Sequence, residues 1–136
     1  MNRIAILVLI FLYGCAAPPP ENIAYEPALL RPYVGTWQSA PVPGSPETVV
    51  FKIELADIYL KLTRYIYTDP QGTSHDLLDR TTLTRGDRDV VIAGKGPQGN
   101  DFTIVLSPPG SGSRFMQGQV TSLGASFPVQ YWPVKQ

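Results

Sequence analysis

Segments of strand length with alternating apolar residues are separated along the chain by clusters of Gly, Pro, Asn and Asp. This arrangement restricts the folds that the chain can adopt. In residues 47–55, ETVVFKIEL, Val49, Phe51 and Ile53 share one face, while Lys52 lies on the other. That period of two is typical of a half-buried strand. Similar segments recur along the chain with short connections, and no convincing amphipathic helix lies between them.

The turn signals divide the chain into eight expected strands. They cover residues 34–39, 47–55, 57–68, 75–84, 89–94, 101–107, 114–121 and 126–134. Short connections make neighbouring strands antiparallel, and a closed barrel removes the exposed edges of such a meander. We therefore predict an all-β fold, an eight-stranded antiparallel up-and-down barrel over residues 33–136. Two packed sheets are the alternative architecture.

Residues 57–68, DIYLKLTRYIYT, also fit a helical period, but their density of Ile, Thr and Tyr favours a strand. The inward face changes from odd to even positions at residues 56–57, where we expect a tight turn or a bulge. The even-numbered face of this strand then carries Ile58, Leu60, Leu62, Arg64 and Ile66. This pattern places Arg64 on an otherwise apolar face, opposite the tyrosines.

An export signal is expected at the start of the chain. Residues 4–13 form an apolar run after Arg3. The run is too short for a membrane span, which needs roughly 20 apolar residues, and its size suits a signal peptide. The only cysteine, Cys15, follows directly after Gly14.

The stretch Leu12-Tyr13-Gly14-Cys15 resembles the lipobox of bacterial lipoprotein precursors. The resemblance implies that residues 1–14 are a signal peptide removed before Cys15, and that Cys15 carries the lipid anchor. Several acyl chains give stable membrane attachment. Ala16, which stands where an Asp would favour the inner membrane, implies the periplasmic face of the outer membrane.

A tether with a short helical turn is expected over residues 15–32. AAPPPENIA has no apolar periodicity, and its three consecutive prolines favour an extended conformation. Pro27 suits the first turn of a helix and Pro32 discourages its continuation, which predicts one helical turn over residues 27–31.

The stretch Tyr33-Val34-Gly35-Thr36-Trp37, after that helical turn, resembles the start of a lipocalin-like (calycin) barrel. The resemblance implies that Trp37 plugs one end of the barrel and that Gly35 gives the backbone room there. Avidin-like barrels and lipoproteins with META domains begin with similar strands, so the resemblance concerns architecture over residues 33–134.

Composition and residue types give little sign of chemistry. Eleven basic residues balance eleven acidic ones, so no basic field attracts nucleic acid. One cysteine allows no intramolecular disulfide. The only histidine, His75, lies in a polar stretch and is expected in solvent, and the aspartates follow no calcium-loop pattern. We expect neither an enzyme nor a metal or cofactor.

Two features predict binding. The first is an aromatic set, whose alternative role is to fill or cover the barrel: Tyr59, Tyr65, Tyr67, Tyr131 and Trp132. The second is Arg64, which would meet a ligand anion or, alternatively, Asp79 or Glu54. We expect a lipid-anchored envelope lipoprotein that binds a small apolar or amphipathic ligand in its barrel. The alternative is a scaffold or inhibitor-like module with a filled barrel that binds an envelope protein.

Overall fold

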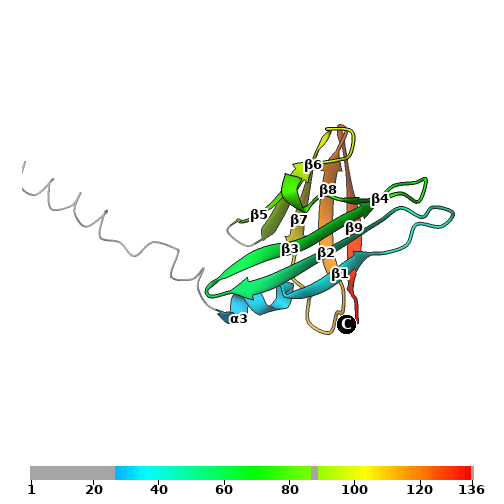
Figure 1. Cartoon of the computed structure of the whole chain (residues 1–136). Coiled ribbons are helices and arrows are strands. Elements are labelled where there is room, and N and C mark those ends of the chain that lie inside the picture. Colours follow the sequence, from blue (N-terminus) through cyan, green and yellow to red (C-terminus); the bar gives the residue numbers. More distant parts are fainter. Residues whose placement is uncertain (1–26, 87–88, 136) are drawn as a thin grey trace, which may run out of the picture.

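The computed structural model describes residues 27–86 and 89–135, which fold into one curled antiparallel sheet (Figure 1). The all-β prediction is confirmed, and the sheet is continuous rather than two separate layers. Its strands are β1 (Gly35–Ser39), β2 (Thr48–Ala56), β3 (Tyr59–Thr68), β4 (Ser74–Asp76), β5 (Thr81–Arg85), β6 (Val90–Lys95), β7 (Asp101–Ser107), β8 (Met116–Ser122) and β9 (Ala125–Pro133). Their order across the sheet is β4-β3-β2-β1-β9-β8-β7-β6-β5, so β9 pairs with β1.

The predicted strand 75–84 is interrupted, which gives nine strands instead of eight. β4 pairs with β3, the 3-10 turn η2 (Leu78–Arg80) follows, and β5 pairs with β6. The antiparallel pairings make β4 and β5 run in the same direction, so together they correspond to one predicted strand that changes neighbour halfway. The sheet is therefore open between β4 and β5, and the chain itself crosses the gap.

Leu77 explains why the strand breaks there. Two leucines in succession end the alternation, and the Leu77 side chain is buried beneath the gap. Its amide donates to the Tyr65 carbonyl at 3.0 Å, and its carbonyl accepts from the Thr81 hydroxyl at 2.6 Å. Gly94 of β6 permits this crossing, because a Cβ there would lie 2.6 Å from the Arg80 carbonyl oxygen.

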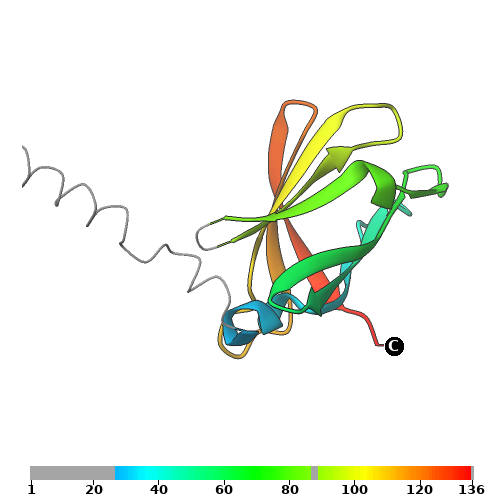
Figure 2. The same ribbon diagram turned by 60° about the vertical axis from the view of Figure 1, so that its left-hand side comes forward.

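One end of the barrel is closed by the helical segment that precedes β1. α3 (Pro27–Leu30) continues into the 3-10 turn η1 (Arg31–Tyr33), so the predicted turn is confirmed and extends by two residues beyond 31. Leu30 and Tyr33 are buried. Figure 2 shows this segment at the lower end of the barrel, with the β6–β7 and β8–β9 hairpins at the upper end.

Trp37 lies at this closed end and is buried. Its Nε1 donates a hydrogen bond to the Tyr33 carbonyl at 3.0 Å, so the indole joins η1 to β1. Gly35 has a φ of 141°, which L side chains rarely adopt, whereas a Cβ there would sit at an ordinary 3.7 Å from the indole nitrogen. Gly35 is thus needed for its backbone conformation rather than for room.

A bulge in β3 reverses the faces expected for its second half. The turn at residues 57–58 changes the inward face as predicted, but the register also shifts between Lys52 and Ile53, which pair with Arg64 and Leu62. Thr63 is the extra residue. Because one added residue exchanges the two faces of a strand, Tyr65 becomes buried and Arg64 is exposed.

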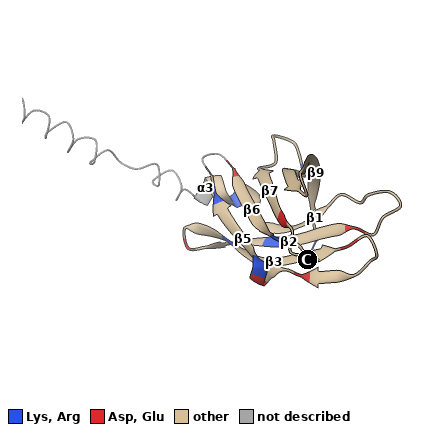
Figure 3. Cartoon of the chain, turned by 90° about the horizontal axis from the view of Figure 1, so that it is seen from above, with Lys and Arg blue, Asp and Glu red and all other residues tan. Residues whose placement is uncertain are grey.

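The outside of the described sheet carries charges of both signs. Basic and acidic residues are interspersed along the strands in Figure 3. Within residues 27–86 and 89–135, no helix has the length and apolar character needed to span a bilayer.

Candidate functional site

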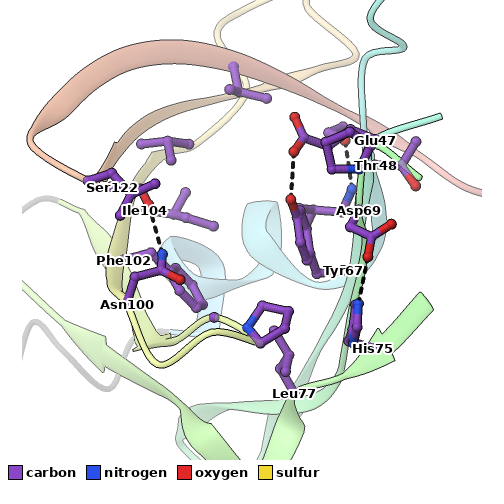
Figure 4. Close-up of a pocket in the computed structure, with 18 of the residues that line it drawn as sticks. Glu47, Thr48, Tyr67, Asp69, His75, Leu77, Asn100, Phe102, Ile104 and Ser122 are labelled. Carbon is purple, nitrogen blue, oxygen red and sulfur yellow. Dashed lines mark hydrogen bonds and ion pairs between the residues drawn. The ribbon is translucent and has the colours of Figure 1, made fainter. Parts of the chain in front are cut away.

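The barrel holds a cavity of about 800 Å³ at the end opposite the helical segment. Four loops form the mouth of this cavity: residues 40–47, 69–73, 96–100 and 123–124. Figure 4 looks into the cavity, with Glu47, Tyr67, Asp69 and His75 on one side and Asn100, Phe102 and Ser122 on the other. Cavities of this size suit small organic ligands, and such sites are typically apolar with a few polar groups.

Four aromatic residues, Phe51, Tyr65, Phe102 and Tyr131, pack in two pairs that we call the aromatic floor; Tyr65, Phe102 and Tyr131 line the cavity. The rings of Phe51 and Tyr131 meet edge to face at 5.1 Å, and those of Tyr65 and Phe102 stack at 5.4 Å. Gly118 of β8 leaves the space for Tyr131, because a Cβ would lie 2.5 Å from the ring carbon Cε2. Two of these residues, Tyr65 and Tyr131, bring phenol groups into the cavity lining.

The hydroxyls of Tyr65 and Tyr131 have no hydrogen-bond partner among the described residues, although the side chains are only 3% and 1% exposed. Neither oxygen is fully enclosed, since Thr63 Oγ1 is the one completely buried unpaired side-chain atom in the described part of the chain. Both residues line the cavity. Burial raises the pKa of each phenol, so both are neutral.

At the rim, Tyr67 and Glu47 form a hydrogen-bonded pair. The Tyr67 hydroxyl donates to Glu47 Oε2 at 2.6 Å, and both residues are half-buried. Burial, followed by the bond to the Glu47 carboxylate, raises the pKa of Tyr67, which keeps its proton. The carboxylate thus faces the mouth with one oxygen bound by a neutral donor.

Asp69 organises the loop between β3 and β4. Its Oδ2 lies 2.9 Å from Nε2 of His75, and its Oδ1 accepts from the amides of Gln71 and Thr73 at 3.0 and 2.9 Å. The bond to His75, then the amide of Thr73, lowers the pKa of Asp69. His75 is half-buried against Tyr67, so the expectation of a histidine free in solvent is wrong.

The charges lining the cavity are unbalanced. Glu47 and Asp69 contribute carboxylates, His75 pairs with Asp69, and no Lys or Arg lines the cavity among the described residues. The walls are formed mainly by aliphatic and aromatic side chains of the strands. The electrostatics of the mouth therefore favour neutral or positively charged groups over anions.

The structure brings together three of the six residues predicted to bind a ligand: Tyr65, Tyr67 and Tyr131 line the cavity. Arg64 is exposed on the outer side of β3, so it offers no cation to the interior. Tyr59 is 60% exposed, and Trp132 lies on the opposite face of β9 from Tyr131. Gly35 and Trp37 belong to the closed end, and Cys15 lies outside the described residues.

Sequence reasoning missed Glu47, Asp69, Asn100 and Gly118. The first three lie in or beside loops that the meander brings to one end, because alternate connections of consecutive antiparallel strands share an end. That signal was available from the sequence. No local signal distinguished Gly118, whose role depends on the Tyr131 ring of the neighbouring strand.

Among the described residues, no three His, Cys, Asp or Glu side chains gather closely enough to form a metal site. Comparison of this chain with family models, with curated proteins and with solved structures finds no match.

Proposed function

We propose that this protein binds a small amphipathic molecule in its barrel. The observation that carries the proposal is the cavity of about 800 Å³ whose walls are mostly apolar and whose lining includes two buried tyrosines, Tyr65 and Tyr131, with hydroxyls unpaired among the described residues. Apolar walls gain free energy from covering an apolar ligand, at roughly 25 cal/mol per Å² buried. Unpaired hydroxyls favour a ligand that also carries a polar atom.

The proposal includes a lipid anchor at Cys15 and a place on the periplasmic face of the outer membrane. The lipobox-like stretch supports the anchor. Residue 27, where the described chain begins, lies at the closed end of the barrel. An anchor that precedes this end leaves the mouth accessible from the aqueous side.

Ligand retention tests the binding proposal. The full chain is purified in lipid nanodiscs, and small molecules are extracted and identified by mass spectrometry against empty nanodiscs. We expect a bound compound in the unmodified chain and its loss in Val129→Phe, because Val129 lines the cavity on β9. Val105→Phe is the matched control, since Val105 lies on β7 outside the cavity lining.

Two results would contradict ligand binding. One is a chain that retains no compound and binds none from a library of amphipathic molecules. The other is equal retention by Val129→Phe and the unmodified chain, which would place the compound outside the barrel.

Metabolic labelling with a fatty acid tests the anchor. We expect the label on the unmodified chain and none on Cys15→Ser, which also leaves the membrane fraction or keeps its leader. Labelling of Cys15→Ser would contradict attachment at this thiol.

A second candidate function, docking to an envelope protein, rests on an aromatic pair on the outer surface. Phe115 and Trp132 lie 5.2 Å apart between ring centroids, and Trp132 is 41% exposed. Aromatic residues are enriched at protein interfaces. Crosslinking in intact envelopes should recover one partner from the unmodified chain and less from Trp132→Ala; recovery that is equal for both would contradict this function.

A further inference from the structure

Resting on the proposed ligand binding, we infer that the ligand class is an amphipathic amine: a protonated amine held by Glu47 at the mouth, followed by an apolar body in the cavity. Carboxylates with the same apolar body are rejected. This assigns a charge preference that the volume and apolar walls of the cavity alone do not give.

Glu47 is the carboxylate at the mouth that has no positively charged partner among the described residues. It lies just before β2 and is half-buried. Its one side-chain bond comes from the neutral Tyr67 hydroxyl. A protonated amine could bind the carboxylate by a charge-assisted hydrogen bond, the stronger kind of hydrogen bond, while Tyr67 keeps its own bond to Oε2.

The other carboxylate of the lining, Asp69, forms hydrogen bonds within and beside its own loop. It is bound by His75 and by the amides of Gln71 and Thr73. Its negative charge adds to the potential at the mouth, but its oxygens already have partners. The direct contact is therefore assigned to Glu47.

The phenols of the floor supply an independent sign of a ligand. Tyr65 and Tyr131 are more than nine-tenths buried, line the cavity and have unpaired hydroxyls among the described residues. A polar atom at the inner end of the ligand, such as an ether, hydroxyl or carbonyl oxygen, would accept a hydrogen bond from them. The amine at the mouth and this polar atom fix the direction of the ligand.

A carboxylate finds no counter-charge in this cavity. In the part of the chain that the structure describes, no Lys or Arg lines the cavity, and Arg64 is exposed on the outer side of β3. Moving an ionised carboxylate from water into an apolar site without a paired cation is costly. Repulsion from Glu47 and Asp69 adds to that cost.

Three amphiphiles with one chain length test the charge preference: octylammonium, octanol and octanoate. Each is dialysed to equilibrium against the full chain in nanodiscs of uncharged phosphatidylcholine, and uptake by empty nanodiscs is subtracted. We expect octylammonium to bind most tightly, octanol more weakly, and octanoate about tenfold or more weaker than octylammonium.

Glu47→Gln tests the residue assignment. The amide still accepts a bond from Tyr67 but has no charge, so we expect octylammonium to bind about tenfold more weakly and octanol to change little. Glu54→Gln is the matched control, because Glu54 is exposed on β2, the strand that Glu47 immediately precedes, and does not line the cavity. It should leave all three affinities unchanged.

The outcomes separate the inference from the proposed function. Equal binding of the three amphiphiles, or tightest binding of octanoate, overturns the charge preference and leaves a binding cavity. An unchanged preference in Glu47→Gln overturns the role of Glu47. Failure of all three to bind, together with no retained compound, overturns the proposed function itself.

Discussion

The two ends of this barrel use the same sheet in opposite ways. At the closed end, Tyr33, Trp37 and Met116 belong to the buried core, and Leu30 of the helical segment is buried as well. At the mouth, the strands continue past the aromatic floor but the lining side chains leave a cavity. Backbone pairing forms the wall at both ends, whereas side-chain volume decides which part of the interior is filled.

The buried polar groups of the two ends differ in their hydrogen bonding. The buried donor of Trp37 is bound to the Tyr33 carbonyl, so the closed end is satisfied internally. The phenols of Tyr65 and Tyr131 are equally buried and have no partner among the described residues. The closed end thus binds its own polar group, whereas the two phenol hydroxyls are open to the cavity and can bond a ligand or water.

The largest expected effect comes from emptying the closed end. Trp37→Ala should lower the free energy of unfolding by about 3–5 kcal/mol, because it creates a cavity and leaves the Tyr33 carbonyl without its donor. Phe127→Ala at the mouth should cost less than about 1 kcal/mol, since Phe127 is 45% exposed. Urea unfolding followed by circular dichroism measures both. Equal losses at the two ends would contradict the comparison.

Overfilling the floor should have the next largest effect. Gly118→Ala places a Cβ against the Tyr131 ring and should destabilise the fold by about 1–3 kcal/mol. Gly110→Ala is the control, because no atom lies within 4 Å of a Cβ at that loop position. The same unfolding measurement applies, and a harmless Gly118→Ala would show that Tyr131 can shift freely.

Removing single phenol hydroxyls should lower the free energy of unfolding more where the hydroxyl is hydrogen-bonded than where it has no partner among the described residues. Tyr67→Phe loses the bond to Glu47 and should cost about 1 kcal/mol. Tyr131→Phe loses no bond to the described residues and should change stability by less than about 0.5 kcal/mol while weakening ligand binding. A large loss of stability in ligand-free Tyr131→Phe would show that this hydroxyl has a structural partner.

The smallest expected effect is a pH dependence of local stability in the loop of residues 69–73 at the mouth. The pKa of Asp69 is lowered in the folded chain, first by its bond to His75, so its contribution is present above the ordinary Asp range and is lost as the pH falls through the lowered value. As the pH falls, we therefore expect amide hydrogen exchange to report a lower free energy of local opening at Gln71 and Thr73. The free energy of opening at the Trp37 amide should fall only at a lower pH. Asp69→Asn should remove this pH dependence; its persistence would assign the effect to another group.

Local patterns were sufficient for the elements of the sheet. The alternation in residues 47–55 and 101–107 predicted β2 and β7, and two prolines located the helical turn before β1. Two successive leucines mark the break between β4 and β5 locally, but the pairing of the two halves with different strands, β3 and β6, is not visible in the local pattern. The bulge at Thr63 is not visible in the local pattern either. Without the bulge, simple alternation predicts Arg64 on the inward face, whereas the structure has it on the outer face.

The candidate site was predicted only in part. The amphipathic rings of Tyr65, Tyr67 and Tyr131 predict binding, and the structure groups these three residues in one cavity. Tyr131 and Trp132 are neighbours in sequence, yet the alternation of a strand sends them to opposite faces. Glu47 and Asp69 depend on which loops share an end, a property of the assembled meander.

The sequence by itself determined the class of fold, because period-two patterns with short connections allow little besides an antiparallel sheet. Only the tertiary structure decided which end is filled, which faces of β3 point inward, and where the barrel opens. The physical reason is that hydrogen-bonding periodicity is local to a strand. Register, bulges and the fit of one side chain against another arise only when distant strands meet.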